Sequence, residues 1–245
     1  MSTKPVLILG GGSDIGLAIA HRFAEAGHPI QLAARKPDDL VPNQRDIELR
    51  YQVEVSLHAF DVLDTTSHVA FLDGLPELPG TVVCVVGLLG DQGESERDIE
   101  AAQTVMRSNY EGPASILALI ANRFEARGSG TIVGISSVAG DRGRASNYIY
   151  GSAKAGFTAF LSGLRNRLAR RGVHVLTVKP GFVNTRMTEG MDTPGALTCE
   201  PEEVAGRVFD ACEKSRDTIY VSRIWWLVMS VICAIPERVF KKTSI

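Results

Sequence analysis

The stretch VLILGGGSDIG, residues 6–16, joins a short apolar run to a helical pattern through three consecutive glycines. The run Val6–Leu9 is typical of a buried strand, and residues 15–26 have helical apolar spacing that ends at Gly27. Glycines allow a sharp turn and close approach to a ligand, and the helix that follows favours an anion at its N-terminus. The stretch therefore predicts a strand–turn–helix unit that binds a dinucleotide, with a plain tight turn as the alternative.

The rest of the chain alternates strand-like and helix-like segments. Apolar runs with the length of buried strands lie at 30–34, 57–60, 81–86, 131–135, 173–178 and 219–221. Helical segments lie at 67–72, 98–127 and 152–171, whereas residues 36–55 are predicted to be loop with a short helix. This order predicts an α/β fold, a Rossmann-type doubly wound parallel sheet in a single domain, followed by a C-terminal apolar tail. Ligands of such sheets bind at the carboxyl ends of the strands.

Composition and charge exclude several classes of protein. The 245 residues include 26 Lys and Arg against 28 Asp and Glu, so no basic field indicates nucleic acid. The longest apolar segment, 224–235, has about twelve residues against the ~20 that span a bilayer, and the N-terminal run is too short for a secretory signal. We therefore predict a cytoplasmic protein. We also predict no metal site, because metal-ligand spacing is absent from the four cysteines, Cys84, Cys199, Cys212 and Cys233.

A serine, a tyrosine and a lysine in the second half of the chain have the spacing of a proton-donating site. Tyr150 and Lys154 are four residues apart in a helical pattern, so their side chains point to the same side. A nearby cation favours a phenolate, so Lys154 is expected to lower the pKa of Tyr150 from its usual value near ~10. Ser137 would hold a carbonyl oxygen beside the phenol. Such a pair also occurs on solvated helices, and the rival phenol Tyr148 lies off the helix face.

Together these motifs resemble the short-chain dehydrogenase/reductase family over nearly the whole chain. In the family's order, the glycine turn is followed by Asn109, Ser137, Tyr150, Lys154, Pro180 and Gly181. Two departures lie in the turn, where Leu9 replaces a threonine and Asp14 replaces the middle glycine. The carboxylate of Asp14 would repel phosphates unless it points away. A third departure is residues 84–87, which keep only the glycine of the family's Asn-Asn-Ala-Gly motif.

The resemblance implies an NAD(P)(H)-dependent oxidoreductase that reduces a carbonyl to an alcohol, or the reverse, by hydride transfer. Tyr150 would donate the proton and Ser137 would polarise the carbonyl. Lys154 would bond the nicotinamide ribose, and Asn109 would hold a water that links Lys154 to solvent. Taken singly, Ser137 could only begin a turn, Asn109 could only bend its helix, and Lys154 could be solvated.

The resemblance also implies which residues contact the cofactor. Asp61 would bond the adenine amine, unless it only serves a turn, and Thr185 would bond the carboxamide. The full predicted set is Gly10, Gly12, Ser13, Asp14, Ile15, Gly16, Arg35, Asp61, Val62, Gly87, Tyr150, Lys154, Pro180, Gly181, Val183 and Thr185.

The residues after the second strand predict the form of the cofactor. NAD enzymes usually place an acid there, against the ribose 2′-hydroxyl, and NADP enzymes place a cation against the 2′-phosphate. This chain has Arg35 and Lys36, with no acid at Ala33 or Ala34. We therefore predict that NADP(H) is preferred over NAD(H), the alternative being that Arg35 only stacks on the adenine.

The C-terminal tail, residues 224–245, is too apolar for an ordinary surface helix and ends in Arg238, Lys241 and Lys242. We treat residues 1–223 as the domain and the tail as a separate segment. A subunit interface or a core helix would explain the tail, and so would a membrane-surface anchor or a groove for a lipid chain. The second explanation would place the protein peripherally at the inner face of the membrane.

The tail, together with Arg142, Arg144 and residues 186–187, resembles the decaprenylphosphoryl 2-keto-sugar (erythro-pentofuranosid-2-ulose) reductases. This resemblance implies a polyprenyl-phosphate-linked 2-keto-sugar as substrate, with Arg142 and Arg144 either meeting its phosphate or lying in a solvated loop. Residues 187–203 are expected to form a lid over the substrate.

Two other functions stay open from the sequence. One is a generic ketone or alcohol dehydrogenase that acts on a soluble substrate. The other is a non-catalytic dinucleotide-binding scaffold or sensor, which Asp14 and the altered residues 84–87 suggest. The family resemblance implies a homodimer or homotetramer formed through residues 98–127 and 152–171.

Overall fold

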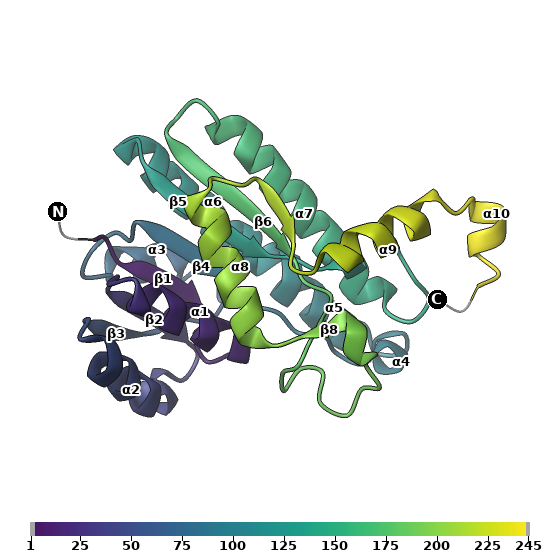
Figure 1. The fold of residues 1–245 in the computed structure, drawn as a ribbon, viewed down its shortest axis with the longest axis horizontal. Helices are drawn as coiled ribbons and strands as arrows, with labels where there is room; N and C mark the ends of the chain where they lie inside the picture. The colour runs from purple at the N-terminus through teal and green to yellow at the C-terminus, as the bar shows by residue number, and fades with distance from the viewer. Residues whose placement is uncertain (1–2, 244–245) are drawn as a thin grey trace.

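The computed structural model describes residues 3–243, and it confirms the α/β fold. A seven-stranded, fully parallel sheet has the order β3-β2-β1-β4-β5-β6-β9 (Figure 1). Its strands are β1 (Val6–Leu9), β2 (Ile30–Ala34), β3 (Val55–Ala59), β4 (Thr81–Cys84), β5 (Gly130–Ile135), β6 (Val173–Lys179) and β9 (Thr218–Tyr220). The strand order reverses between β1 and β4, which is where such sheets open a crevice for a ligand.

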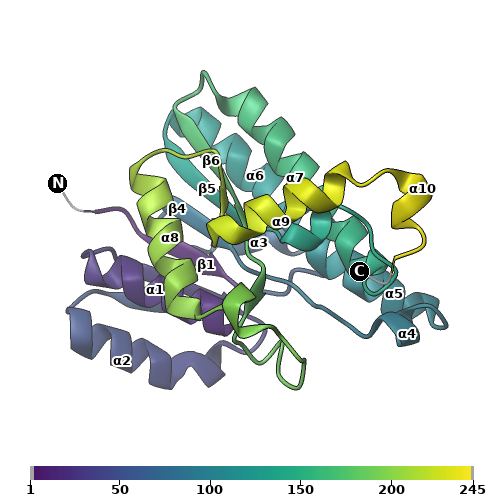
Figure 2. The same cartoon turned by 45° about the vertical axis from the view of Figure 1, so that its right-hand side comes forward.

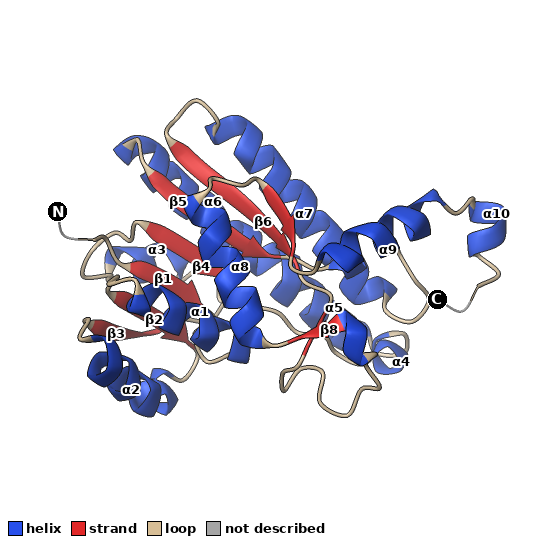
Figure 3. Ribbon diagram, in the orientation of Figure 1, coloured by secondary structure: helices blue, strands red, loops and turns tan. Residues whose placement is uncertain are grey.

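Helices cover both faces of the sheet (Figure 3). They are α1 (Asp14–Glu25), α2 (Val41–Tyr51), α3 (His68–Asp73), α4 (Gln92–Ser95), α5 (Ile99–Met106), α6 (Gly112–Arg127), α7 (Tyr148–Leu168), α8 (Pro201–Glu213), α9 (Arg223–Ala234) and α10 (Glu237–Phe240). One apolar layer buries Phe23 of α1 and Val204 of α8 against the strands. The opposite layer buries Phe124 of α6 and Phe157 of α7. The strands are therefore apolar on both sides, as parallel strands require.

Two parts of the chain differ from the sequence prediction. Residues 36–55 are not mainly loop, because Val41–Tyr51 forms a regular helix. Pro42 lies in the first turn of that helix, where its missing amide hydrogen costs no hydrogen bond. The predicted helix 98–127 is interrupted by a π-helical turn at Arg107–Glu111, which separates α5 from α6.

The tail forms α9 and α10, which project from one end of the sheet in both views (Figure 2). The inner face of α9 buries Trp225, Met229 and Ile232 in a small cluster with Val138 and Phe240. Its outer face exposes Ile224, Trp226, Leu227 and Val231. None of the helices in residues 3–243 is long and apolar enough to cross a membrane.

Candidate active site

A cleft opens where β1, β4, β5 and β6 end. Nine of the predicted site residues line it together: Ile15, Gly87, Ser137, Tyr150, Lys154, Pro180, Gly181, Val183 and Thr185. Ile15 lies in the first turn of α1, Tyr150 and Lys154 lie in α7, and the others lie in or next to the segments that follow β4, β5 and β6, so only the folded sheet brings them together. No carboxylate of residues 3–243 lines this cleft.

The Ser137, Tyr150 and Lys154 side chains meet because two elements face each other across the cleft. Ser137 follows β5 and begins a short 3-10 turn, in which its Oγ accepts a hydrogen bond from the Ala139 amide at 3.1 Å. Tyr150 and Lys154 lie in the first turns of α7, which starts at Tyr148, earlier than predicted. Lys154 is 3% exposed, and its Nζ donates to the Ile135 carbonyl oxygen at 3.0 Å. The nitrogen lies 5.7 Å from the centroid of the Tyr150 ring.

Burial dominates the ionisation of the phenol and the ammonium. It raises the pKa of Tyr150 to about 12, although a hydrogen bond with Ser137 acts in the opposite direction. Burial also lowers the pKa of Lys154 to about 8. The expectation that Lys154 lowers the Tyr150 pKa is therefore wrong for this arrangement, because desolvation of the phenol outweighs any effect of the lysine. Lys154, in contrast, can gain or lose its proton near neutral pH.

Asn109 is fully buried in the π-helical turn and does not line the cleft. Its Nδ2 donates to the carbonyl oxygens of Leu88, at 2.6 Å, and Val105, at 2.8 Å, while its Oδ1 accepts from the Leu88 amide at 3.3 Å. The side chain thus ties the loop after β4 to α5. Its predicted role in holding a water stays a prediction, and both of its amide hydrogens already have partners.

The glycine turn has the geometry that an anion site needs. Gly10 has a φ of 92°, and a Cβ on Gly16 would lie 2.6 Å from the Gly10 carbonyl oxygen, so α1 starts directly against the turn. Ser13 caps the helix by accepting from the Gly16 amide. The amides of Gly12, Asp14 and Ile15 donate to no group within residues 3–243. Such unpaired donors at a helix N-terminus fit the pyrophosphate of a dinucleotide.

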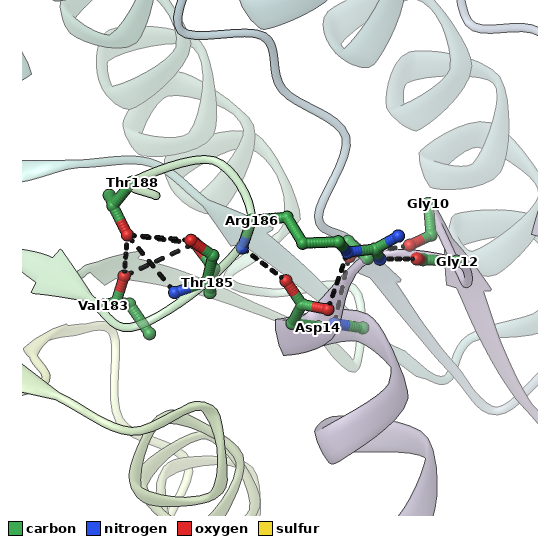
Figure 4. Close-up of polar contacts among 9 residues, drawn as sticks. Gly10, Gly12, Asp14, Val183, Thr185, Arg186 and Thr188 are labelled. Atoms are coloured by element: carbon green, nitrogen blue, oxygen red, sulfur yellow. Dashed lines mark hydrogen bonds and ion pairs between the residues drawn. The ribbon is translucent and has the colours of Figure 1, made fainter. Parts of the chain in front are cut away.

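The carboxylate of Asp14 pairs with Arg186, which follows Thr185 (Figure 4). Its Oδ2 accepts from the Arg186 backbone amide at 2.9 Å, and its Oδ1 accepts from Nε at 3.0 Å. The charge that seemed incompatible with bound phosphates is therefore matched by a cation.

The predicted residues for the adenosine end lie at the same edge of the sheet but outside this cleft. Arg35 is exposed at the end of β2. Asp61 is exposed after β3, and its Oδ1 accepts from the Leu63 amide at 2.9 Å, so it does serve a turn. Val62 is buried and packs closely against the start of α6. A Cβ on Gly112 would lie only 2.3 Å from the Val62 carbonyl oxygen. Their contacts with a cofactor stay predictions.

Trp225 of α9 lines the cleft but was not predicted from the sequence as a site residue. Met187 and Met191 reach the cleft from the loop after the short strand β7 (Phe182–Val183), within the stretch 187–203 that was expected to cover the substrate. No local pattern marks Trp225, because its neighbours in the cleft are distant in sequence. The sequence signal that could have pointed to Arg186 was Asp14. A carboxylate in a turn predicted to bind phosphate needs a positively charged partner.

The two arginines expected to meet a substrate phosphate have different surroundings. The prediction that Arg142 contacts a substrate phosphate is wrong. Its Nη1 instead donates to the carbonyl oxygens of Ile232 and Ile235, each at 2.6 Å, at the end of α9. Its guanidinium also stacks 3.8 Å from the Phe240 ring centroid. Arg144 lines the cleft, forms no ion pair within the described residues, and has a buried Nε without a partner.

Comparisons with known proteins agree with this geometry. The family model described as short chain dehydrogenase matches residues 4–194. An uncharacterised oxidoreductase of Mycobacterium tuberculosis is 40% identical over 220 residues, covering 89% of this chain and 88% of its own length. An uncharacterised oxidoreductase of Streptomyces coelicolor is 34% identical over 242 residues, covering 98% and 95%.

A solved structure shares the fold. The short-chain dehydrogenase from Sphingobium yanoikuyae in complex with NADPH superposes with a TM-score of 0.82 at 23% identity, covering 96% of this chain and 97% of that one. Because the family model spans most of the chain and the relatives cover almost all of it, the chain belongs to the short-chain dehydrogenase/reductase family of NAD(P)-dependent oxidoreductases.

Proposed function

We propose that the protein reduces a carbonyl compound to an alcohol, or catalyses the reverse reaction, with a proton passing through Tyr150. The observation that carries this proposal is that Ser137, Tyr150 and Lys154 line one cleft, together with Ile15 from the start of α1 next to the glycine turn. The nicotinamide dinucleotide supplies or accepts the hydride when it is bound. The protein's own contribution is to position the reacting groups and to deliver the proton.

Each of the three side chains has a distinct part in that delivery. The Tyr150 hydroxyl keeps its proton at neutral pH and can donate it to an oxygen on which negative charge develops. The Ser137 hydroxyl provides a second donor to the same oxygen. Lys154, whose pKa of about 8 lies close to working pH, can return a proton after turnover. Apolar side chains, among them Leu89 and Met187, line the cleft and lower the polarity around the reacting groups.

Replacing one of two neighbouring phenols tests the proposal. Tyr150→Phe should reduce turnover by about 10²–10⁴-fold, the usual contribution of a general acid. Tyr148→Phe is the matched control, because Tyr148 is exposed in the same helical turn, and it should keep full activity. The readout is NADPH oxidation with a panel of carbonyl compounds. If the wild-type protein binds NADPH but oxidises it with no carbonyl in the panel, and Tyr150→Phe changes nothing in cells, the scaffold function is favoured instead.

For the cofactor, we infer a preference for NADP(H). Arg35 and Lys36 support it, since both are exposed after β2 and neither forms an ion pair with a described residue. Arg35→Ser should weaken NADPH binding by about tenfold and NADH binding much less, which corresponds to one lost charged hydrogen bond. Arg170→Ser, at an exposed position just after the end of α7, controls for the change in net charge. Tighter binding of NADH than NADPH by the wild type would contradict the preference.

For the substrate, we propose an anionic carbonyl compound, and the polyprenyl-phosphate-linked 2-keto-sugar suggested by resemblance is one such compound. Arg144 supports this, because an unpaired guanidinium in a cleft that no described carboxylate lines favours an anion. Arg144→Met should raise the KM for phosphate-bearing ketones and leave neutral ketones unchanged. An equal effect on both would favour a generic ketone reductase.

The outer face of α9 supports a peripheral membrane contact as a second proposal. Trp226 and Leu227 are each 59% exposed, and the cations Arg238 and Lys241 lie close by in sequence. A Trp226→Ser/Leu227→Ser variant should lose binding to vesicles of anionic lipid, whereas Leu49→Ser, at an exposed leucine on α2, should not. If the variant instead changes the sedimentation of the protein without lipid, the face is a subunit interface. The predicted homodimer or homotetramer through α5, α6 and α7 and the cytoplasmic location stay predictions.

A further inference from the structure

A clasp joins two loops of the site that are far apart in sequence. Asp14 and Arg186 are 172 residues apart, and three hydrogen bonds connect them or their immediate surroundings. Two run from the backbone amide and Nε of Arg186 to the Asp14 carboxylate. The third runs from Nη2 of Arg186 to the Gly12 carbonyl oxygen at 2.5 Å (Figure 4). We call these contacts the Asp14–Arg186 clasp.

The loop after the short strand β7 (Phe182–Val183) is folded so that Arg186 faces the glycine turn. Thr188 Oγ1 donates to the Val183 carbonyl oxygen at 2.6 Å and accepts from the Thr185 amide at 3.2 Å. These bonds close a tight turn over residues 183–188, which leaves the Arg186 amide and guanidinium on the side of Asp14 (Figure 4). Thr185 and Met187, on either side of Arg186, line the cleft. The clasp thus sets one wall of the cleft relative to the start of α1.

The position of Asp14 explains why the turn needs such a cation. Asp14 is the first residue of α1, next to the unpaired amides that fit a pyrophosphate. A carboxylate there already interacts with the positive end of the helix and repels a second anion. Arg186 neutralises that carboxylate and also donates to the carbonyl oxygen of Gly12, which carries a partial negative charge in the same turn. Its Nη1 donates to no group within residues 3–243.

We propose that Arg186 is a positioning residue for the dinucleotide, acting through Asp14 to let the glycine turn accept a pyrophosphate. This inference rests on the proposed function, because it requires a dinucleotide at that turn. It assigns a task to the charged residue that replaces the family's glycine. The two residues support dinucleotide binding only as a pair. Asp14 without Arg186 would repel the pyrophosphate, and Arg186 without Asp14 would lose the carboxylate that holds it in place.

The experiment measures ligand binding to four proteins: wild type, Arg186→Met, Asp14→Gly and the double variant. Calorimetric titration uses NADPH, ADP-ribose, which keeps the pyrophosphate, and adenosine, which lacks it. Arg186→Met should weaken ADP-ribose binding by about tenfold and adenosine binding by less than about twofold. Adding Asp14→Gly should restore most of the lost ADP-ribose affinity, because the uncompensated carboxylate is then gone. Arg186→Lys, which keeps the charge, should fall between wild type and Arg186→Met.

A second readout needs no ligand. Amide hydrogen exchange over residues 185–191 should be faster in both single variants than in the wild type, and Arg170→Met should leave it unchanged. Equal losses for ADP-ribose and adenosine would show a merely structural role, and unchanged binding in Arg186→Met would also overturn the inference. A wild-type protein that binds neither NADPH nor ADP-ribose would instead contradict the proposed function.

Discussion

A β-carbon at Gly181 would lie 1.8 Å from the indole nitrogen of Trp225. The indole is held there because its Nε1 donates to the Leu197 carbonyl oxygen at 2.9 Å. Gly181 follows β6, and Trp225 belongs to α9. Gly181, a residue of the predicted cofactor site, is therefore also a packing contact of the tail. The tail is therefore part of the wall of the cleft.

Gly181→Ala should displace the indole and destabilise the protein by about 1–3 kcal/mol, the usual effect of overpacking a filled site. Urea denaturation measures this change. Gly195→Ala is the matched control, because no atom lies within 4 Å of a Cβ at that position. Trp225→Ala in the Gly181→Ala background should recover part of the stability. Equal stability of the Gly181→Ala and Gly195→Ala variants would contradict the contact.

Lys154→Met should change how stability depends on pH. Lys154 has its ordinary pKa of 10.5 in the unfolded chain and a pKa of about 8 in the folded protein. Between these values the unfolded state binds more protons, so wild-type stability rises with pH. The variant lacks this titration, so its stability relative to wild type should be constant below pH 8 and fall above it, by up to about 1.4 kcal/mol per pH unit.

The check is urea denaturation of both proteins from pH 7 to pH 10 without cofactor. Lys214→Met replaces an exposed lysine and serves as the control. A stability difference between Lys154→Met and wild type that stays constant over the whole range would show that Lys154 keeps its ordinary pKa in the folded protein.

Asn109→Ala should destabilise the protein by about 1–3 kcal/mol, because it removes the three side-chain hydrogen bonds that tie the loop after β4 to α5. The loop after β4 should also show faster amide hydrogen exchange. Asn122→Ala, at an exposed asparagine on α6, should stay within about 0.5 kcal/mol of wild type. If the Asn109→Ala variant were as stable as the wild type, water would have replaced the side-chain amide without loss of stability, which would contradict this prediction.

Arg142→Ala should loosen the tail, because the guanidinium is the partner of the last carbonyl groups of α9. We expect faster amide hydrogen exchange and faster proteolysis within residues 223–243, with the rest of the protein unchanged. Arg238→Ala, at an exposed arginine on α10, is the control. Unchanged protection of α9 in Arg142→Ala would show that the apolar cluster holds the helix by itself.

The sequence predicted the parts of the site that local patterns and topology determine. The glycine turn lies where a strand pattern meets a helix pattern, and Tyr150 and Lys154 lie four apart in one helix, so their placement needs no long-range information. Once the strands are parallel, the loops that follow them must meet at one edge of the sheet. The fold and the grouping of Ser137, Tyr150 and Lys154 follow from this.

The features that were missed depend on contacts between distant segments. Nothing near Arg142 indicates that it caps a helix about ninety residues later, and its charge alone suggested a phosphate. The pKa expectation for Tyr150 failed for a related reason, because spacing predicts which groups are near each other but not how completely the fold removes them from water.

The seating of Trp225 has a thermodynamic consequence for the two faces of α9. The inner face contributes a wall to the cleft, and the outer face carries the exposed Trp226 and Leu227. Anything that binds the outer face and shifts the helix must change the affinity of the cleft for its substrate. By reciprocity, the substrate then changes the affinity of the outer face by the same factor.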